Sequence, residues 1–277
     1  MVTFGDIRGA IRSLKLSNRP LCVHSSLRSF GWVDGSASTV VDGLLAEGCT
    51  VLVPTFSWDC FGIPPPPDMQ PERNGLYYED YDGTFSGIGR VYAPESMEID
   101  QDMGAIPAAA LAMPGRVRGN HPLCSFTAVG SLAEELIFDQ KPLDVFAPLR
   151  NLAETSGSVL LMGVGLESMT FIHLAERVAG RNLFRRWANS TDGRPMMVEV
   201  GGCGGFDNFK PIFASLMREI RVGKSVWLAF PARETLEAAT KAIRENPNIT
   251  HCDNPHCGRC NDAVKGGPIL TTVRSGY

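Results

Sequence analysis

Three side chains that could take part in catalysis recur three residues apart: the Thr170 hydroxyl, the His173 imidazole and the Glu176 carboxylate. Residues at this spacing share one face of a helix, so the three groups should form one stripe. The stripe begins one turn beyond a predicted strand, where open α/β sheets carry their active sites. A structural interpretation stays open, because such a histidine is often simply buried and Glu176 can pair with Arg177 or Arg181.

The segment before this stripe has the pattern of a strand buried on both faces. Residues 159–162 are all apolar, and short uninterrupted runs of this kind are typical of central strands in parallel sheets. A turn with two glycines follows over 163–168, and then Phe171, Ala175 and Val178 recur at helical spacing. The pattern predicts a helix that packs one face on the sheet.

Two further strands, predicted over 21–23 and 50–53 and connected by a helix over 37–47, also end in polar loops. Such strand-helix-strand units are right-handed and bring both strand ends to one edge of the sheet. The residues of interest at these ends are His24, Ser25, Ser26, Leu27 and Thr55. Their hydroxyl and backbone N–H groups could hold a pyrophosphate, although no GxGxxG or GxxxxGK[ST] motif is present. The serines could equally cap the turn.

Composition limits the class of function. The 277 residues are 44% hydrophobic, which suits one large α/β domain, and no internal repeat is evident. A net charge of −4 provides no basic surface for nucleic acid and is compatible with a cationic ligand. Charges interrupt the first 16 residues and no apolar run reaches transmembrane length. We expect a cytoplasmic protein with neither nucleic acid nor membrane as partner; a homodimer stays open.

Residues 59–113 differ from the rest of the chain. They contain four consecutive prolines, the aromatic residues Tyr77, Tyr78 and Tyr81, and many acids, with little apolar periodicity. The acids noted are Asp59, Asp68, Glu72, Glu79, Asp80, Asp82, Glu95, Glu98, Asp100 and Asp102. We expect an irregular acidic insertion that forms a lid or minor subdomain over the active site, with a solvated loop as the alternative.

The second half of the chain offers further elements. Arg118 could clamp a phosphate, because a guanidinium fork matches phosphate oxygens. Helices are predicted over 131–138, with a capping box from Ser131 to Glu134, over 149–154 and over 231–246. Strands are predicted over 196–200 and 226–230. Phe209, Phe213, Leu216, Met217 and Ile220 suggest one face of another helix.

The tail provides a rival signal, for a metal. Two histidines and three cysteines fall within ten residues, enough for one tetrahedral zinc site: His251, Cys252, His256, Cys257 and Cys260. Only one CxxC is present, however, and the eight cysteines of the chain also suit free thiols. Zinc at Cys252, Cys257 and Cys260 is therefore allowed but not expected.

Several motifs resemble one known family in their order and sequence. They are HSSLRSFG at 24–31, VPTFS at 53–57, MGAIP at 103–107, Arg118 with His121, Pro122 and Ser125, and GVG at 163–165 before TFIHLAE at 170–176. This set covers most of the chain and closely resembles the aminoglycoside 3-N-acetyltransferases. The resemblance implies an acetyl-CoA dependent transferase that is distinct from the GNAT acetyltransferases. We expect one α/β domain over 1–277, with a central, largely parallel sheet flanked by helices.

The resemblance also implies roles for particular residues. The implied contacts for coenzyme A are His24, Ser25, Ser26, Leu27, Thr55, Arg118, His121 and Ser125. His173 and Glu176 are the implied catalytic pair, in which the imidazole removes a proton from a small cationic amine and the carboxylate orients the ring. Thr170 or a backbone N–H would stabilise the oxyanion formed by attack on the thioester.

Two departures from the family pattern concern the acceptor. Where the family often has a glutamate and then an arginine, this chain has Ala108 and Leu111, and Gly119 replaces a serine. Acetylation of the 3-amino group of 2-deoxystreptamine antibiotics, which gives resistance by modification, is the first expectation. Acyl transfer from an acyl-CoA to a different amine is the second. A zinc-bearing binding module without catalysis is the third.

Overall fold

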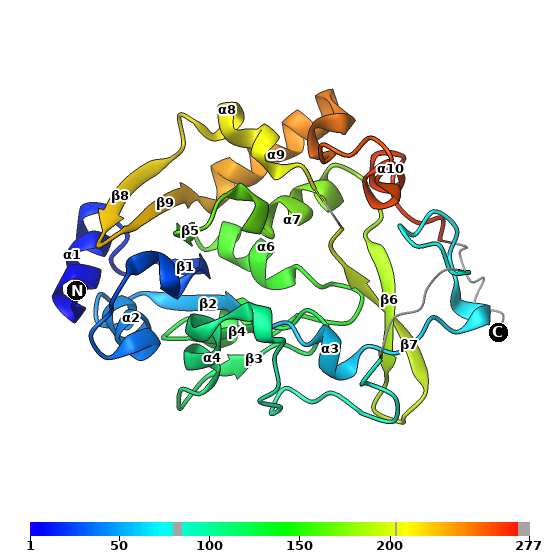
Figure 1. The fold of residues 1–277 in the computed structure, drawn as a ribbon, viewed down its shortest axis with the longest axis horizontal. Helices are drawn as coiled ribbons and strands as arrows, with labels where there is room; N and C mark the ends of the chain where they lie inside the picture. The colour runs from blue at the N-terminus through cyan, green and yellow to red at the C-terminus, as the bar shows by residue number, and fades with distance from the viewer. Residues whose placement is uncertain (80–84, 203, 271–277) are drawn as a thin grey trace.

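A computed structural model describes residues 1–79, 85–202 and 204–270 of the chain. Within these residues, a seven-stranded sheet has the order β3-β4-β2-β1-β5-β9-β8, and β6 pairs with β7 in a separate ribbon (Figure 1). The strands of the large sheet are β1 (Pro20–Ser25), β2 (Thr50–Pro54), β3 (Val117–Arg118), β4 (Phe126–Val129), β5 (Ser158–Met162), β8 (Arg218–Val222) and β9 (Ser225–Pro231).

The centre of this sheet is parallel. Cys22 of β1 lies between Leu52 of β2 and Val159 of β5, with both neighbours running in its own direction. Only β4 and β9 run against their neighbours, so the other five described strands share one direction. The expected α/β fold, with a central, largely parallel sheet, is confirmed. The strand ends predicted to meet, those of β1, β2 and β5, lie together at one edge.

Helices cover both faces of the sheet (Figure 1). Successive residues of each central strand alternate between two apolar cores: Cys22 packs in one, and Leu21 and Val23 in the other. The helices over the second core are α1 (Phe4–Ser13), α2 (Ser36–Leu45) and α4 (Ala105–Leu111). Those over the first core are α5 (Ala133–Ile137), α6 (Ala147–Glu154), α7 (Phe171–Val178) and α9 (Ala232–Glu245). None of the helices within the described ranges is long and apolar enough to cross a bilayer.

The acidic insertion lies mainly beside the ribbon of β6 (Phe184–Asn189) and β7 (Pro195–Val200) (Figure 1). Trp187 Nε1 donates to the Met69 carbonyl at 3.0 Å, and Gly62 and Val91 form isolated bridges to β6. Its described regular elements are short: α3 (Trp58–Phe61) and two 3₁₀ turns. The noted residues Asp80, Tyr81 and Asp82 lie outside the described residues.

The expected end of the insertion at residue 113 is too late. Helix α4 contributes Ile106 and Ala110 to the same core as α2, so it belongs to the helical layer of the main sheet. Three residues near the end of the predicted insertion line the cleft described below: Asp102, Met103 and Pro107.

Two local predictions are wrong. Helix α5 begins at Ala133, and its N-cap, Leu132, makes no side-chain hydrogen bond, so the capping box at Ser131 does not form. The helix predicted from Phe209 to Ile220 is confined to α8 (Lys210–Phe213), and β8 follows. Residues 218–222 form a strand because they pair with β9 in an antiparallel hairpin. Gly223, at φ +60°, makes the tight turn between the two strands.

Candidate active site

A cleft of about 310 Å³ opens where the parallel strands end. It is lined by the last residues of β1 and β2, by residues that follow β2 and β5, and by the 3₁₀ turn before α4 and the first turn of α4: Val23, His24, Ser25, Pro54, Phe56, Asp102, Met103, Pro107, Val164, Glu167, Ser168 and Thr170. The topology explains the convergence, since parallel neighbours bring their carboxyl ends to one edge. Of the predicted residues, His24, Ser25 and Thr170 are thus brought together.

The cleft is negatively charged. Its lining includes the carboxyl groups of Asp102 and Glu167, and no lysine or arginine of the described chain lines it. Glu167 is held in place by the Gly165 N–H, which donates to Oε1 at 2.9 Å. A cationic ligand is therefore favoured over an anionic one at this part of the edge.

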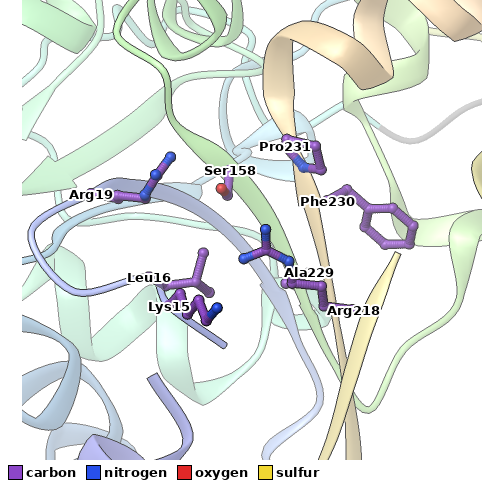
Figure 2. Close-up of a pocket in the computed structure, with 8 residues that line it drawn as sticks. All are labelled: Lys15, Leu16, Arg19, Ser158, Arg218, Ala229, Phe230 and Pro231. Atoms are coloured by element: carbon purple, nitrogen blue, oxygen red, sulfur yellow. The ribbon is translucent and has the colours of Figure 1, made fainter. Parts of the chain in front are cut away.

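A smaller pocket of about 50 Å³ lies at the other end of β5 and has the opposite charge. Figure 2 shows it beside Ser158, the first residue of that strand, with Lys15, Arg19 and Arg218 in its wall. It lacks a carboxylate among the residues that line it, so a cationic ligand would be repelled there. The two ends of β5 thus present opposite charges.

His173 lies on the first turn of α7 and is oriented by Glu176. Its Nδ1 donates to Glu176 Oε2 at 2.6 Å, and the imidazole side chain is only 11% exposed. Because Nδ1 carries the proton, Nε2 of the neutral ring has a lone pair. Among the described residues, none forms a hydrogen bond with Nε2. The predicted pair is formed, and the nitrogen that could accept a substrate proton is the one without a protein partner in the described chain.

Two aromatic rings and one glycine hold the imidazole. Phe146 stacks on His173 with ring centroids 5.9 Å apart, and Phe206 meets it edge-on at 4.9 Å. Gly201 lies so close that an added Cβ would be 2.7 Å from Nε2. These contacts restrict the ring to one orientation.

Glu176 is itself held by a buried arginine. Its Oε1 accepts from Arg181 Nη1 at 2.6 Å, and both side chains are less than a tenth exposed. Arg181 also donates to Thr250 Oγ1 at 2.8 Å and to the Pro247 carbonyl at 2.6 Å, both on the 3₁₀ turn η6 (Pro247–Thr250). Glu176 thus bridges the imidazole and the guanidinium, and its carboxylate can stabilise positive charge on the ring. We call His173, Glu176 and Arg181 the relay.

The end of β1 and the loop after it contribute groups that a ligand could use. Burial lowers the pKa of His24 to about 4, so this imidazole is neutral near pH 7. Ser25 Oγ is buried and has no hydrogen-bond partner among the described residues. Ser26 and Leu27 continue the loop, where the Ser26 N–H donates to the Met162 carbonyl at 3.0 Å and Leu27 begins a 3₁₀ turn. Their contact with coenzyme A stays a prediction.

The phosphate clamp predicted at Arg118 is not supported by the geometry. The buried guanidinium donates to three backbone carbonyls, those of Thr55, Ser96 and Glu98, and to the hydroxyl of Ser125. Binding a phosphate would require breaking these contacts. Arg118 instead ties the insertion to the end of β2.

Thr55, Ser125 and His121 are structural in the same way. The Thr55 hydroxyl bonds to Thr127 Oγ1 at 2.9 Å, and Ser125 Oγ donates to the Thr55 carbonyl at 2.9 Å. His121 is fully buried: Nδ1 accepts from the Cys124 N–H and Nε2 donates to the Glu199 carbonyl. None of the three lines the cleft, so the structure gives them no contact with a ligand there.

Sequence reasoning missed the residues that surround the imidazole. Arg181 was noted as a possible partner of Glu176, and that pairing is confirmed. Phe146, Gly201, Phe206 and Thr250 come from distant segments, and nothing in their spacing indicates that they converge on α7. Asp102 was noted within a long acidic stretch without a role at the cleft.

Neither His173 nor Glu176 lines the cleft, but Thr170, three residues before His173, does. An imidazole that is oriented by a carboxylate, one helical turn beyond a cleft at the strand ends of an α/β sheet, is the arrangement of an acid-base enzyme. The comparison with known families specifies the class further. The family model described as aminoglycoside 3-N-acetyltransferase matches residues 22–244. The chain belongs to this family.

Individual relatives agree with this assignment. Aminoglycoside N(3)-acetyltransferase IX of Micromonospora chalcea is 31% identical over 186 residues, which are 64% of this chain and 63% of the relative. The chain thus spans about three fifths of the length of that curated relative. The crystal structure of aminoglycoside acetyltransferase AAC(3)-IVa superimposes with a TM-score of 0.75 over 96% of this chain and 98% of its own, at 23% identity. A binary complex of AAC-IIIb with CoASH has a TM-score of 0.69 over 88% and 96%, at 19% identity.

Proposed function

We propose that the protein transfers the acetyl group of acetyl-CoA to the 3-amino group of 2-deoxystreptamine aminoglycosides. The observation that carries the proposal is the relay: in a member of this family, an oriented imidazole, with Nε2 unpaired among the described residues, lies one helical turn beyond Thr170, which lines a negative cleft. The two lining carboxylates suit a polycationic acceptor. Resistance by modification of the antibiotic follows from this reaction.

The relay supports a direct transfer. The unprotonated amine attacks the thioester carbonyl while His173 Nε2 takes a proton from its nitrogen. The new C–N bond forms a tetrahedral intermediate, and its collapse breaks the C–S bond and releases coenzyme A, whose sulfur receives the proton. Glu176 stabilises the imidazolium between the two steps, and Arg181 keeps the carboxylate in place. Thr170, at the cleft wall before α7, is the proposed oxyanion donor.

The acetyl donor is proposed to enter at the end of β1 and along the loop that follows it. His24 and Ser25 at the end of β1 line the cleft. The complex of AAC-IIIb with CoASH supports coenzyme A as the donor for a protein of this fold.

A different amine is the second candidate acceptor. Ala108, where the family often has a glutamate, is exposed and follows Pro107, which lines the cleft. With Ala108 in place of a glutamate, the enzyme has one carboxylate fewer near the cleft. The loss of electrostatic attraction is smaller for an acceptor with fewer positive charges.

A thiol-release assay with acetyl-CoA tests the proposal. Wild-type enzyme is given a panel of 2-deoxystreptamine antibiotics and a panel of simple amines, and each reaction is repeated with His173→Ala. We expect release with the antibiotics and a fall of about 10²- to 10⁴-fold in kcat for the variant, with acetyl-CoA affinity within a few-fold. Release with simple amines alone would support the second candidate. Full turnover by His173→Ala would remove the imidazole from the mechanism.

A further inference from the structure

The tail brings metal-binding side chains together. The ligand atoms of His251, Cys252 and Cys260 all lie within 4.8 Å of one another. Cys260 is carried by helix α10 (Gly258–Val264), and its sulfur accepts the Cys252 N–H at 3.4 Å. We propose that this cluster is a zinc site, with His251, Cys252 and Cys260 as ligands and Cys257, which completes a CxxC with Cys260, as the fourth.

The donor set suits zinc better than other common cations. Three sulfurs and one imidazole form a Cys₃His set, and structural zinc sites use such closed tetrahedral sets. The sequence contains one CxxC only, which argued against zinc. The fold brings the adjacent His251 and Cys252 to Cys260 of the CxxC, and Cys257, which lies outside that group of three, is the proposed fourth ligand.

The hydrogen bonds around the cluster also fit a metal. A metal-bound histidine usually keeps its other ring N–H on a carbonyl oxygen. Nδ1 of His251 already has such a partner, the Cys252 carbonyl at 2.8 Å, so Nε2 is the proposed metal ligand. On binding the metal, Nε2 would give up its 3.1 Å contact with Asn261 Oδ1. The Cys252 N–H directed at the Cys260 sulfur would stabilise a thiolate there.

The site is connected to the relay through one residue. Thr250 precedes His251, and its hydroxyl accepts from Arg181 while its carbonyl accepts the Gly205 N–H at 2.7 Å. Asn208 donates to the His251 carbonyl at 3.2 Å. A metal on His251 would therefore fix both the segment that holds Arg181 and the segment that carries Phe206, which contacts His173. We infer a structural metal that positions the relay and does not touch the substrate.

Metal content of the full chain tests the site directly. The protein is produced with zinc in the medium, passed through a desalting column and analysed by elemental mass spectrometry. We expect about one zinc ion per chain and a loss of at least tenfold in Cys252→Ser and in Cys260→Ser. Cys60→Ser and Cys49→Ser are the matched controls, half-buried and buried respectively, and should retain the metal.

A second measurement covers the case in which the variants fail to fold. Wild-type protein is treated with a strong chelator, and its thermal unfolding is followed before treatment, after treatment and after zinc is returned. We expect a lower Tm after chelation and recovery with zinc. Cobalt in place of zinc should produce the absorption bands of tetrahedral thiolate coordination. Less than about 0.1 zinc per chain in the wild type, no cobalt spectrum, or full metal content in both cysteine variants would overturn the proposal.

Discussion

At the scale of single residues, the position of the His173 ring depends on a neighbour that has no side chain. A Cβ on Gly201 would lie 2.4 Å from His173 Cδ2 and 2.7 Å from Nε2, closer than such atoms approach without displacement. Phe146 and Phe206 close the other sides of the ring. The imidazole thus has little room to move away from an added methyl group.

We therefore expect Gly201→Ala to lower kcat by at least about tenfold, because misplacing a catalytic group by about 1 Å can cost 10²-fold. The free energy of unfolding should fall by about 1–3 kcal/mol, as is usual for overpacking. Steady-state kinetics and urea unfolding measure the two effects. Gly9→Ala is the control: its added Cβ meets nothing within 4 Å, and it should leave kcat unchanged. Equal kcat for the two variants would contradict the tight fit.

A second prediction at this scale concerns acid stability. Burial lowers the pKa of both His24 and His121 to about 4, against about 6.5 in an unfolded chain. Between these values the unfolded state binds more protons than the folded state, so the free energy of unfolding decreases as the pH falls from 6.5 to 4. Each histidine contributes a slope of up to about 1.4 kcal/mol per pH unit.

His121→Gln removes one of these groups and should therefore flatten the slope. Urea unfolding at several pH values tests this. The variant should be less stable than the wild type at pH 8, where its lost hydrogen bonds dominate, and the gap should narrow steadily below pH 6.5. A gap that stays constant down to pH 4.5 would mean that His121 does not titrate between the two states.

At the scale of elements, Arg118 joins the insertion to the sheet. Its carbonyl partners belong to two segments: Thr55 follows β2, and Ser96 and Glu98 lie in the insertion. Truncating it would leave several buried carbonyl groups without a donor, at about 1–3 kcal/mol for each group that finds no other partner. The link is therefore a feature of stability rather than of ligand binding.

We expect Arg118→Ala to lower the free energy of unfolding by about 2–4 kcal/mol, with no selective rise in the KM for acetyl-CoA. Arg116→Ala is the matched control, because Arg116 holds the Pro94 and Glu95 carbonyls of the same segment but is half-buried. Arg116→Ala should lower the free energy of unfolding by less than half as much as Arg118→Ala. A large, selective increase of the KM for acetyl-CoA in Arg118→Ala would instead support the prediction that Arg118 binds a phosphate of coenzyme A.

The elements that could be predicted from the sequence are those with strong local signals. The uninterrupted apolar runs of β1, β2 and β5 and the helical spacing of α7 located the parallel centre and the relay on it. Strand β6 was missed because two charged residues, Arg185 and Arg186, lie in it, and the insertion and Glu199 provide their partners. Strand β8 was missed because its residues are mostly exposed, so little of its apolar alternation could appear.

The same distinction applies to the site. Thr170, His173 and Glu176 are close in sequence, so helix geometry alone places them on one stripe. The buried roles of Thr55, Arg118, His121 and Ser125 depend on carbonyl groups that only the tertiary fold supplies. A motif therefore identifies polar residues that make hydrogen bonds. It does not tell whether their hydrogen-bond partner is a ligand or the protein backbone.

At the scale of the whole molecule, charge is distributed unevenly along the sheet. The net charge is −4, with carboxyl groups at the cleft and a basic pocket at the opposite end of β5. This separation should draw a polycationic acceptor toward the cleft and orient its approach. Salt would weaken the attraction, because the Debye length falls from about 10 Å at 0.1 M to about 3 Å at 1 M.

We therefore expect kcat/KM for a polycationic aminoglycoside to fall steeply between 0.1 M and 1 M salt. A singly charged amine in the same assay is the control and should change little. Asp102→Asn should reduce the salt dependence for the polycation, since Asp102 is one of the two carboxylates that line the cleft. Parallel salt profiles for the two acceptors would show that long-range attraction does not select the substrate.

The parallel pairing of β1 with β5 also affects how the chain folds as it is synthesised. Cys22 pairs with Val159, and the ribosome makes about 140 residues between them, which takes roughly 7–28 s at about 5–20 residues per second. Throughout that interval one hydrogen-bonding edge of β1 has no native strand to receive it. After β5 has been made, its other hydrogen-bonding edge stays unpaired until β9 is synthesised. A strand at the centre of the finished sheet therefore has, during synthesis, an unpaired edge that could pair with the wrong chain.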